Sequence, residues 1–399
     1  MIGKGIIERF YEAASIQRWN DHVRPVELTE LDKQAHKMII AFVLAKYEAN
    51  ERDADINWIS LIEGGIFEFL HRLILTDIKP PVFHQMMERK GRELNEWVLE
   101  QLGPDISGIK GDFAVRFREY LLGDTEAHKL EKKILRAAHY LATNWEFKII
   151  YNMNPFIYGI ERTKEEIENE IEDYFDLIGV QKISLGKKSF GFIDLCGQLR
   201  FQQRWAQSPR LPKTSVLGHL LIVAMLAYLC SIEIDACNRR IYNNYFSALF
   251  HDLPEVLTRD IVSPVKSSIK GLQDLIKEYE AIQVEERILP LLPPAWHKEI
   301  RFFVEDEFEN KVLRQGEIIK GLSNEEITAK YNRAECSPLD GKIIKACDHL
   351  AAFIEASLSI KYGVKAPHLE EGKKRLQEMY RGKIIAGINF GEIFDYFLA

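Results

Sequence analysis

The sequence contains four blocks that occur twice in the same order, and this repeat constrains the fold more than any other feature. Residues 5–19 align without gaps with residues 191–205, at a shift of 186, and both segments end in Gln-Arg-Trp. Three later blocks, at shifts of 183, 180 and 209, pair His36 with His219, His71 with His251, and His139 with Asp348. Repeated blocks in a fixed order predict a tandem duplication that folds into two similar domains.

Helical periodicity dominates both copies. Apolar residues recur at helical spacing, most clearly in residues 39–47, 217–231 and 343–360, whereas alternating β-branched patterns are scarce. We therefore expect an all-α protein made of two tandem helical bundles related by internal pseudo-symmetry.

The copies are joined by an acidic segment, residues 163–179, with apolar residues at helical spacing. A capping box at Thr163 and Glu166 predicts where this helix begins, and Gly179 predicts where it ends. We expect a first domain at residues 1–155, a connecting acidic helix at 156–186 and a second domain at 187–399.

Composition excludes several classes of protein. The 399 residues carry 60 acidic and 53 basic side chains, a net charge of −7, which leaves no basic excess for binding a nucleic-acid polymer. The longest apolar run, residues 216–232, contains His219 and is short for a bilayer span, so it predicts a buried helix and no membrane association. No secretory signal is visible and five cysteines lack a CxxC pair, so we expect a cytoplasmic protein with reduced thiols.

The second copy contains residues suited to metal chemistry. His219 lies in an apolar helix, the pair His251-Asp252 ends another, and Asp348 lies in a third. One buried histidine is usually a core residue, but two imidazoles and two carboxylates directed toward one core form a divalent-cation site. Burying both carboxylates without a cation would cost much free energy. We expect one divalent ion, and these ligand types leave Mn, Co, Fe, Ni and Zn open.

Three further polar residues follow the His-Asp pair. Glu255 lies three residues after Asp252, where a helix would place both on one face and bring Glu255 within reach of a metal-bound water. Asp260 lies beyond the turn and could orient a substrate hydroxyl. Lys266 could meet a phosphate or only solvent, and the sequence favours neither alternative.

The order His, His-Asp, Asp resembles the HD-domain metal-dependent phosphohydrolases. Within that superfamily, the string FHDLPEVLTRDIVSPVK around His251 is similar to the bacterial 5′-deoxynucleotidase branch, in which a His-Asp pair precedes Glu-Val-Leu-Thr-x-Asp and Pro-Val-Lys. Arg204-Trp205, 14 residues before His219, also matches that branch in residue type and spacing. The resemblance covers residues 188–380 well and residues 5–150 in outline.

This resemblance implies a role for each residue. The metal ligands would be His219, His251, Asp252 and Asp348. Arg204 would orient the substrate phosphate, and Trp205 would pack against the sugar and help to select 2′-deoxyribose. Glu255 would assist the attacking water, and Asp260 would hold the nucleotide. The implied activity is removal of phosphate from 5′-deoxynucleoside monophosphates by a metal-activated water.

The first copy lacks both carboxylates, because Arg72 and His139 replace them. The positive charge of Arg72 repels a divalent ion, so we expect no catalytic metal there. Three interpretations compete: a structural partner domain, a nucleotide site that uses Arg18, Trp19 and Arg72, or an all-His metal site. Members of this branch commonly pair as homodimers, so the fused copies could form an intrachain pseudo-dimer, and a homo-oligomer is also open.

Two departures from the branch leave the substrate open. Residues 294–339 form a longer segment than in compact members, and His349 follows Asp348. Because this segment borders the expected pocket, neither the nucleobase nor the number of phosphates is fixed. The alternatives are a (deoxy)nucleoside triphosphate or modified-nucleotide phosphohydrolase and, from another class, a nucleotide-sensing or interaction protein with a vestigial HD site.

Overall fold

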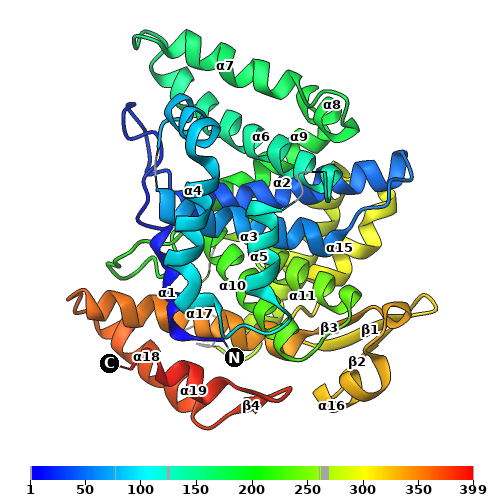
Figure 1. Cartoon of the computed structure of the whole chain (residues 1–399). Helices are drawn as coiled ribbons and strands as arrows, with labels where there is room; N and C mark the ends of the chain where they lie inside the picture. The colour runs from blue at the N-terminus through cyan, green and yellow to red at the C-terminus, as the bar shows by residue number, and fades with distance from the viewer. Residues whose placement is uncertain (1, 77, 124–125, 260, 262–268, 399) are drawn as a thin grey trace. The chain divides into compact units, whose positions relative to one another are not determined.

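The structure is a computed structural model that describes residues 2–76, 78–123, 126–259, 261 and 269–398. Most of these residues are helical, and the strands among them are short (Figure 1). The all-α fold class predicted from periodicity is therefore confirmed. Two residues of the predicted site, Asp260 and Lys266, lie outside the described residues.

The chain divides into two compact units whose composition departs from chain order. Unit 1 consists of Met1–Tyr11, Asp105–Phe113 and Leu199–Ala399. Unit 2 consists of Glu12–Pro104 and Ala114–Gln198. These units differ from the expected domains 1–155, 156–186 and 187–399, because the first helix belongs to unit 1 and residues 188–198 belong to unit 2.

The elements that lie mainly in unit 1 are α1(Lys4–Glu12), η1(Leu199–Phe201), α10(Val216–Glu233), α11(Asn238–Phe250), α12(Glu255–Thr258), α14(Leu272–Gln283), η2(Val284–Ile288), η3(Leu289–Leu291), η4(Pro294–Trp296), α15(His297–Val304), β1(Asn310–Arg314), β2(Glu317–Lys320), α16(Asn324–Glu326), η5(Ile327–Tyr331), η6(Ala334–Cys336), β3(Pro338–Asp340), α17(Gly341–Lys361), α18(Pro367–Tyr380), β4(Ile384–Ile385), β5(Ile388–Asn389) and α19(Phe390–Asp395). Those mainly in unit 2 are α2(Glu30–Glu51), α3(Trp58–Leu75), α4(Pro80–Ile106), α5(Phe113–Leu122), α6(Lys129–Met153), α7(Ile160–Glu172), α8(Ile178–Ser184) and α9(Lys188–Gln198).

Helix α10 forms the centre of unit 1. Ser215 caps its N-terminus, where Ser215 Oγ accepts a hydrogen bond from Gly218 N at 2.9 Å. The helix is long and apolar enough to cross a membrane, but 94% of its apolar window is buried, as expected of a core helix. Helices α11 and α17 pack against α10, so polar side chains on these three helices can meet inside the unit.

A small sheet lies in the segment predicted to be an insertion, residues 294–339. Strand β1 pairs antiparallel with β2 on one side and with β3 on the other (Figure 1). Asp340 at the end of β3 accepts hydrogen bonds from Arg240 Nε at 2.6 Å and Arg240 Nη2 at 2.7 Å. This buried bidentate pair joins α11 to the start of α17, the helix that carries Asp348.

Unit 2 is built around α2, which contacts α3, α6, α8 and α9. Thr29 caps this helix, and Thr29 Oγ1 accepts a hydrogen bond from Asp32 N at 3.3 Å. The cap defines the first residue of α2. Counting from this residue shows which side chains of α2 correspond to side chains of α10.

The acidic segment between the copies differs from the predicted single helix. Helix α7 already begins at Ile160, so Thr163 lies inside it and its hydroxyl donates to Gly159 O instead of capping the helix. Gly179 lies inside α8, where an added Cβ would come within 2.6 Å of Leu44 Cδ2. This glycine therefore serves close packing and does not end a helix.

One loop has the same local geometry in both units. Trp19 has a φ of 56° and Trp205 a φ of 57°, values that are uncommon for a residue other than glycine. An isolated antiparallel bridge accompanies each loop, Gln17 with Thr29 and Gln203 with Ser215. Each of these pairs of positions differs by 186, the shift found in the first repeated block.

Candidate active site

Four side chains predicted from the sequence converge in unit 1. His219 Nε2 lies 2.9 Å from Asp348 Oδ1. His251 Nε2 lies 3.2 Å from Asp252 Oδ2 and 4.0 Å from Asp348 Oδ1. Ligand atoms of His219, His251 and Asp252 all lie within 4.8 Å of one another. Atoms that bind one ion at about 2.1 Å are separated from each other by about 3 to 4 Å. His219, His251 and Asp252 are therefore candidates to share a divalent cation, and Asp348 lies beside both histidines.

The packing of three helices brings these side chains together. His219 lies in the first turn of α10, His251 directly follows α11, and Asp348 lies on α17. Asp252 occupies the turn between α11 and α12. Both histidine side chains are fully buried, whereas the side chains of Asp252 and Asp348 are 19% and 17% exposed. The group is therefore reached from solvent on its carboxylate side.

Both imidazoles are oriented with Nε2 toward the carboxylates. His251 Nδ1 donates to Ala248 O at 2.7 Å, and His219 Nδ1 lies 3.4 Å from Glu355 Oε1. Metal-binding histidines typically use their second ring nitrogen in this way, to contact a carbonyl or a carboxylate. His251 Nε2 is buried and has no hydrogen bond of acceptable geometry to the described residues, which fits a nitrogen that binds a metal.

The electrostatics of the group also suit a cation. Burial would raise the pKa of Asp252, but His251 outweighs burial and lowers this pKa to about 2. Burial is outweighed in the same way at Asp348, where the hydrogen bond with His219 keeps the pKa of the carboxyl well below its usual range. Burial would lower the pKa of His251, but Asp252 raises it to about 9. Both carboxylates are ionised at neutral pH, the form that binds metal.

Arg204 lies beside the same group. Its guanidinium nitrogens are each 3.9 Å from one carboxylate oxygen of Asp252, Asp348 and Glu355. At these distances the guanidinium lies beside all three carboxylates. Its side chain is 14% exposed, which leaves it accessible to a phosphate from solvent.

The sequence analysis missed Glu355, a fully buried carboxylate that organises this site. Glu355 Oε2 accepts a hydrogen bond from Trp205 Nε1 at 3.0 Å, and Oε1 accepts one from Thr214 Oγ1 at 2.8 Å. Burial would raise the pKa of Glu355, but Arg210, 3.5 Å away, helps to hold it well below its usual range. Two signals could have found it: Glu355 lies two helical turns after Asp348, and it aligns with a glutamate of the first copy.

That glutamate is Glu146, which makes the equivalent contact in unit 2. Glu146 Oε2 accepts a hydrogen bond from Trp19 Nε1 at 2.9 Å and another from Arg18 Nε at 2.8 Å. The tryptophan loop of each unit is thus anchored to a buried glutamate.

Glu255 and His349 occupy positions that the sequence left open. Glu255 is buried at the start of α12, one turn after Asp252. Its backbone N donates to Asp252 O at 3.0 Å, so the turn holds the two residues close together. His349 Nδ1 lies 3.0 Å from the Tyr380 hydroxyl, so its ring is hydrogen-bonded outside the ligand group.

The helix caps correct the predicted alignment of His36 with His219. Helices α2 and α10 begin directly after their capping residues Thr29 and Ser215, and counting from the caps makes Lys33 the counterpart of His219. The contacts agree, because Lys33 Nζ contacts His139 Nδ1 where His219 contacts Asp348.

His36 is a core residue of unit 2. Its Nε2 lies 2.8 Å from Ile193 O, and its ring meets Trp145 edge-on. The predicted alternative of an all-His metal site is therefore not formed by His36 with His71 and His139. Within the described part of the chain, the group with ligand atoms close enough for a metal is the one in unit 1.

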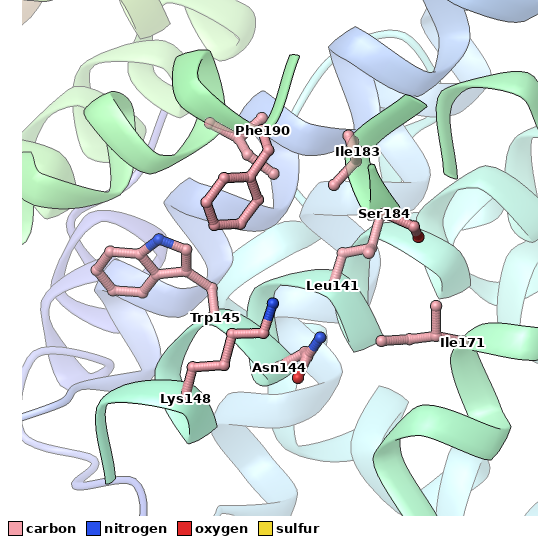
Figure 2. Close-up of a pocket in the computed structure, with 9 residues that line it drawn as sticks. Leu141, Asn144, Trp145, Lys148, Ile171, Ile183, Ser184 and Phe190 are labelled. Atoms are coloured by element: carbon pink, nitrogen blue, oxygen red, sulfur yellow. The ribbon is translucent and has the colours of Figure 1, made fainter. Parts of the chain in front are cut away.

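A cavity in unit 2 does not provide a second substrate site. Figure 2 shows it between the side chains of Trp145, Phe190, Leu141 and Ile171. Its volume is about 40 Å³, far below the roughly 300 Å³ at which small-molecule sites begin. We interpret it as a packing gap between helices.

Comparisons with known proteins agree with this site. Residues 196–377, just under half of the chain, match the HD domain family, in agreement with the resemblance to HD-domain phosphohydrolases noted in the sequence. The matched residues include all four side chains of the ligand group.

The relatives point to one branch of that class. The chain is 31% identical to a 5′-deoxynucleotidase of Shewanella oneidensis over 116 residues, 27% of this chain and 57% of that protein. It is 25% identical to a 5′-deoxynucleotidase of Vibrio atlanticus over 197 residues, 48% of this chain and 84% of that protein. The first match thus spans little more than half of the relative's length. No solved structure gives a significant match.

Proposed function

We propose that the chain is a metal-dependent phosphohydrolase that removes phosphate from 5′-deoxynucleoside monophosphates. The observation that carries this proposal is the convergence of His219, His251, Asp252 and Asp348 beside Arg204. The HD domain and the 5′-deoxynucleotidase relatives support the same assignment.

A divalent ion held by these four ligands would lower the pKa of a bound water and polarise a phosphoryl oxygen. Arg204 would bind the substrate phosphate through its planar guanidinium. Trp205, held by Glu355, would pack against the sugar, and the Glu255 carboxylate would take the proton of the attacking water. We further propose that Asp260 and Lys266, outside the described residues, contact the nucleotide.

We also propose that the two halves of the chain arose by duplication and form an intrachain pseudo-dimer. The matched tryptophan loops and their glutamate anchors support this origin. So does the exchange of first helices, since α1 belongs to unit 1 and the aligned helix α9 belongs to unit 2. Sedimentation of the purified chain should give a monomer, and a stable dimer that is required for activity would contradict the proposed intrachain pair.

Phosphate release tests the proposed activity. The full chain loaded with Mn²⁺ or Co²⁺ should release inorganic phosphate from deoxynucleoside monophosphates faster than from ribonucleotides. His251→Ala should abolish release, and the matched His71→Ala of unit 2 should not. Release of pyrophosphate or tripolyphosphate from triphosphates would favour the alternative substrate class. If the metal-loaded protein released no phosphate from any nucleotide, the proposal would be wrong.

A further inference from the structure

Unit 2 contains a buried basic cluster at the positions that correspond to the ligand group of unit 1. Lys33 is fully buried on α2, and its ammonium contacts His139 Nδ1. Among the described residues, no carboxylate forms an ion pair with Lys33 within 4 Å. A buried ammonium without a carboxylate is costly, so this position calls for another source of negative charge.

The carboxylates of the cluster are paired with other cations. Arg18 binds both Glu30, at 2.9 Å, and Glu146, at 2.8 Å. Lys37 is paired with Glu68, which also accepts a hydrogen bond from the Tyr120 hydroxyl at 2.7 Å.

The cluster contains both basic and acidic side chains. Its basic side chains are Arg18, Lys33, Lys37 and Arg72. Its carboxylates are Glu30, Glu68 and Glu146. Among the described residues Lys33 forms no ion pair with any of these carboxylates, so a bound anion would compensate its charge when it is protonated.

Two side chains of this cluster are partly exposed to solvent. Arg72 is 19% exposed, and its Nε lies 3.9 Å from Glu30 Oε2. His139 is also partly exposed, although Lys33 beneath it is buried. Arg72 and His139 correspond to Asp252 and Asp348, the partly exposed carboxylates through which the unit 1 group meets solvent.

We propose that unit 2 binds a phosphate monoester, without metal and without hydrolysing it, through Lys33, Arg72 and His139. The ammonium of Lys33 would take the role that the metal has in unit 1, and the fork of Arg72 suits a phosphate dianion. Burial and the neighbouring cations keep the pKa of His139 well below its usual range. The neutral ring accepts from Lys33 at Nδ1 and so presents an Nε2–H donor.

The Trp19 loop repeats the anchoring of the Trp205 loop, to which we assign the sugar of the substrate in unit 1. Trp19 is anchored to Glu146 as Trp205 is anchored to Glu355. Burial strongly lowers the pKa of Lys33, and a bound dianion would favour its charged form again. Binding of the dianion would therefore be accompanied by protonation of Lys33.

Calorimetric titration of the full chain in EDTA tests this proposal, with inorganic phosphate, deoxyadenosine monophosphate and deoxyadenosine as probes. EDTA removes the metal on which phosphate binding in unit 1 depends. The wild type should bind both phosphate compounds, and Lys33→Met should bind them about tenfold more weakly or worse. Lys46→Met, on the same helix, and Arg204→Ala, in unit 1, should bind like the wild type.

Each outcome of this titration is decisive. Lys33→Met removes a buried charge, so in the absence of ligand this variant should unfold at the same temperature as the wild type or at a higher one. If Lys33→Met does not fold, Arg72→Gln serves as the second variant. Tighter binding of the nucleotide than of phosphate supports a nucleotide site, and equal binding supports a phosphate site. The proposal is overturned if the wild type binds neither, if both variants bind normally, or if Arg204→Ala alone loses binding. No turnover is measured, so the result is independent of the proposed hydrolase activity.

Discussion

His219 Nε2 and Asp348 Oδ1 lie 2.9 Å apart in unit 1, and Lys33 and His139 make the corresponding contact in unit 2. The first pair combines an imidazole with a carboxylate, which suits a cation. The second combines an amine with an imidazole, which does not. The corresponding positions of the two units therefore carry side chains of opposite charge preference.

Metal content should depend on Asp348 and not on its counterpart. Asp348→Ala removes one of four ligands, so the variant should retain much less than one ion per chain after dialysis against Mn²⁺. His139→Ala should retain the wild-type amount, close to one ion per chain. Elemental analysis measures both, and an equal loss in the two variants would contradict a metal site confined to unit 1.

Glu355→Gln should destabilise unit 1. The substitution keeps the side-chain shape but removes the negative charge beside Arg210 and His219. Because breaking a buried ion pair leaves a buried charge, the free energy of unfolding should fall by about 2 to 5 kcal/mol. Urea unfolding measures this change. The exposed control Glu371→Gln should shift it by less than about 0.5 kcal/mol, and similar losses in both would argue against the buried network.

Gly372→Ala should displace Trp205. An added Cβ would lie 2.5 Å from Trp205 Cη2 and 2.9 Å from Cζ3, so the indole must move. We expect kcat/KM for deoxynucleotide hydrolysis to fall about tenfold or more, with metal content unchanged. Gly103→Ala is the control, because its Cβ would meet nothing within 4 Å. Unchanged kinetics in Gly372→Ala would remove Trp205 from the substrate site.

Because of Glu30, the free energy of unfolding of unit 2 should decrease at acidic pH. Burial would raise its pKa, but Arg18 and neighbouring cations lower it from 4.5 to about 2. A lowered pKa stabilises the fold above the unfolded pKa, and this contribution is lost as the pH falls from about 4.5 toward 2. Over that interval the wild type should lose about 3 kcal/mol more than Glu30→Gln. Urea unfolding at stepped pH measures the difference, and parallel curves would refute it.

The proximity of His219, His251, Asp252 and Asp348 in unit 1 could be predicted because their order along the chain, His, His-Asp, Asp, resembles a known family pattern. The position of Lys33 could not. A three-residue offset is close to one helical turn and leaves the apolar face nearly unchanged, so residue identity favoured His36 as the match for His219. The caps Thr29 and Ser215 decide the register, and their role is visible only in the folded helices.

The boundaries of the units escaped sequence analysis for a different reason. Tyr11 donates through its hydroxyl to Ala351 O at 3.0 Å, a contact between residues 340 positions apart. Apolar patterning shows that α1 buries a face, but it does not show which helices cover that face. Domain boundaries predicted from the sequence therefore divide the chain into consecutive segments, whereas each compact unit combines segments that are separate in the sequence.

Because α1 belongs to unit 1 and α9 belongs to unit 2, each compact unit needs a helix from the other half of the sequence. A gene cut between residues 186 and 187 would yield two fragments, one without the α9 that completes unit 2 and one without the α1 that completes unit 1. Each separated helix would expose side chains that are buried in the intact protein. In α1 these include Ile6, Ile7 and Phe10. Deleting the N-terminal half would remove α1 from unit 1, so the C-terminal half depends on it even if the N-terminal half binds no metal.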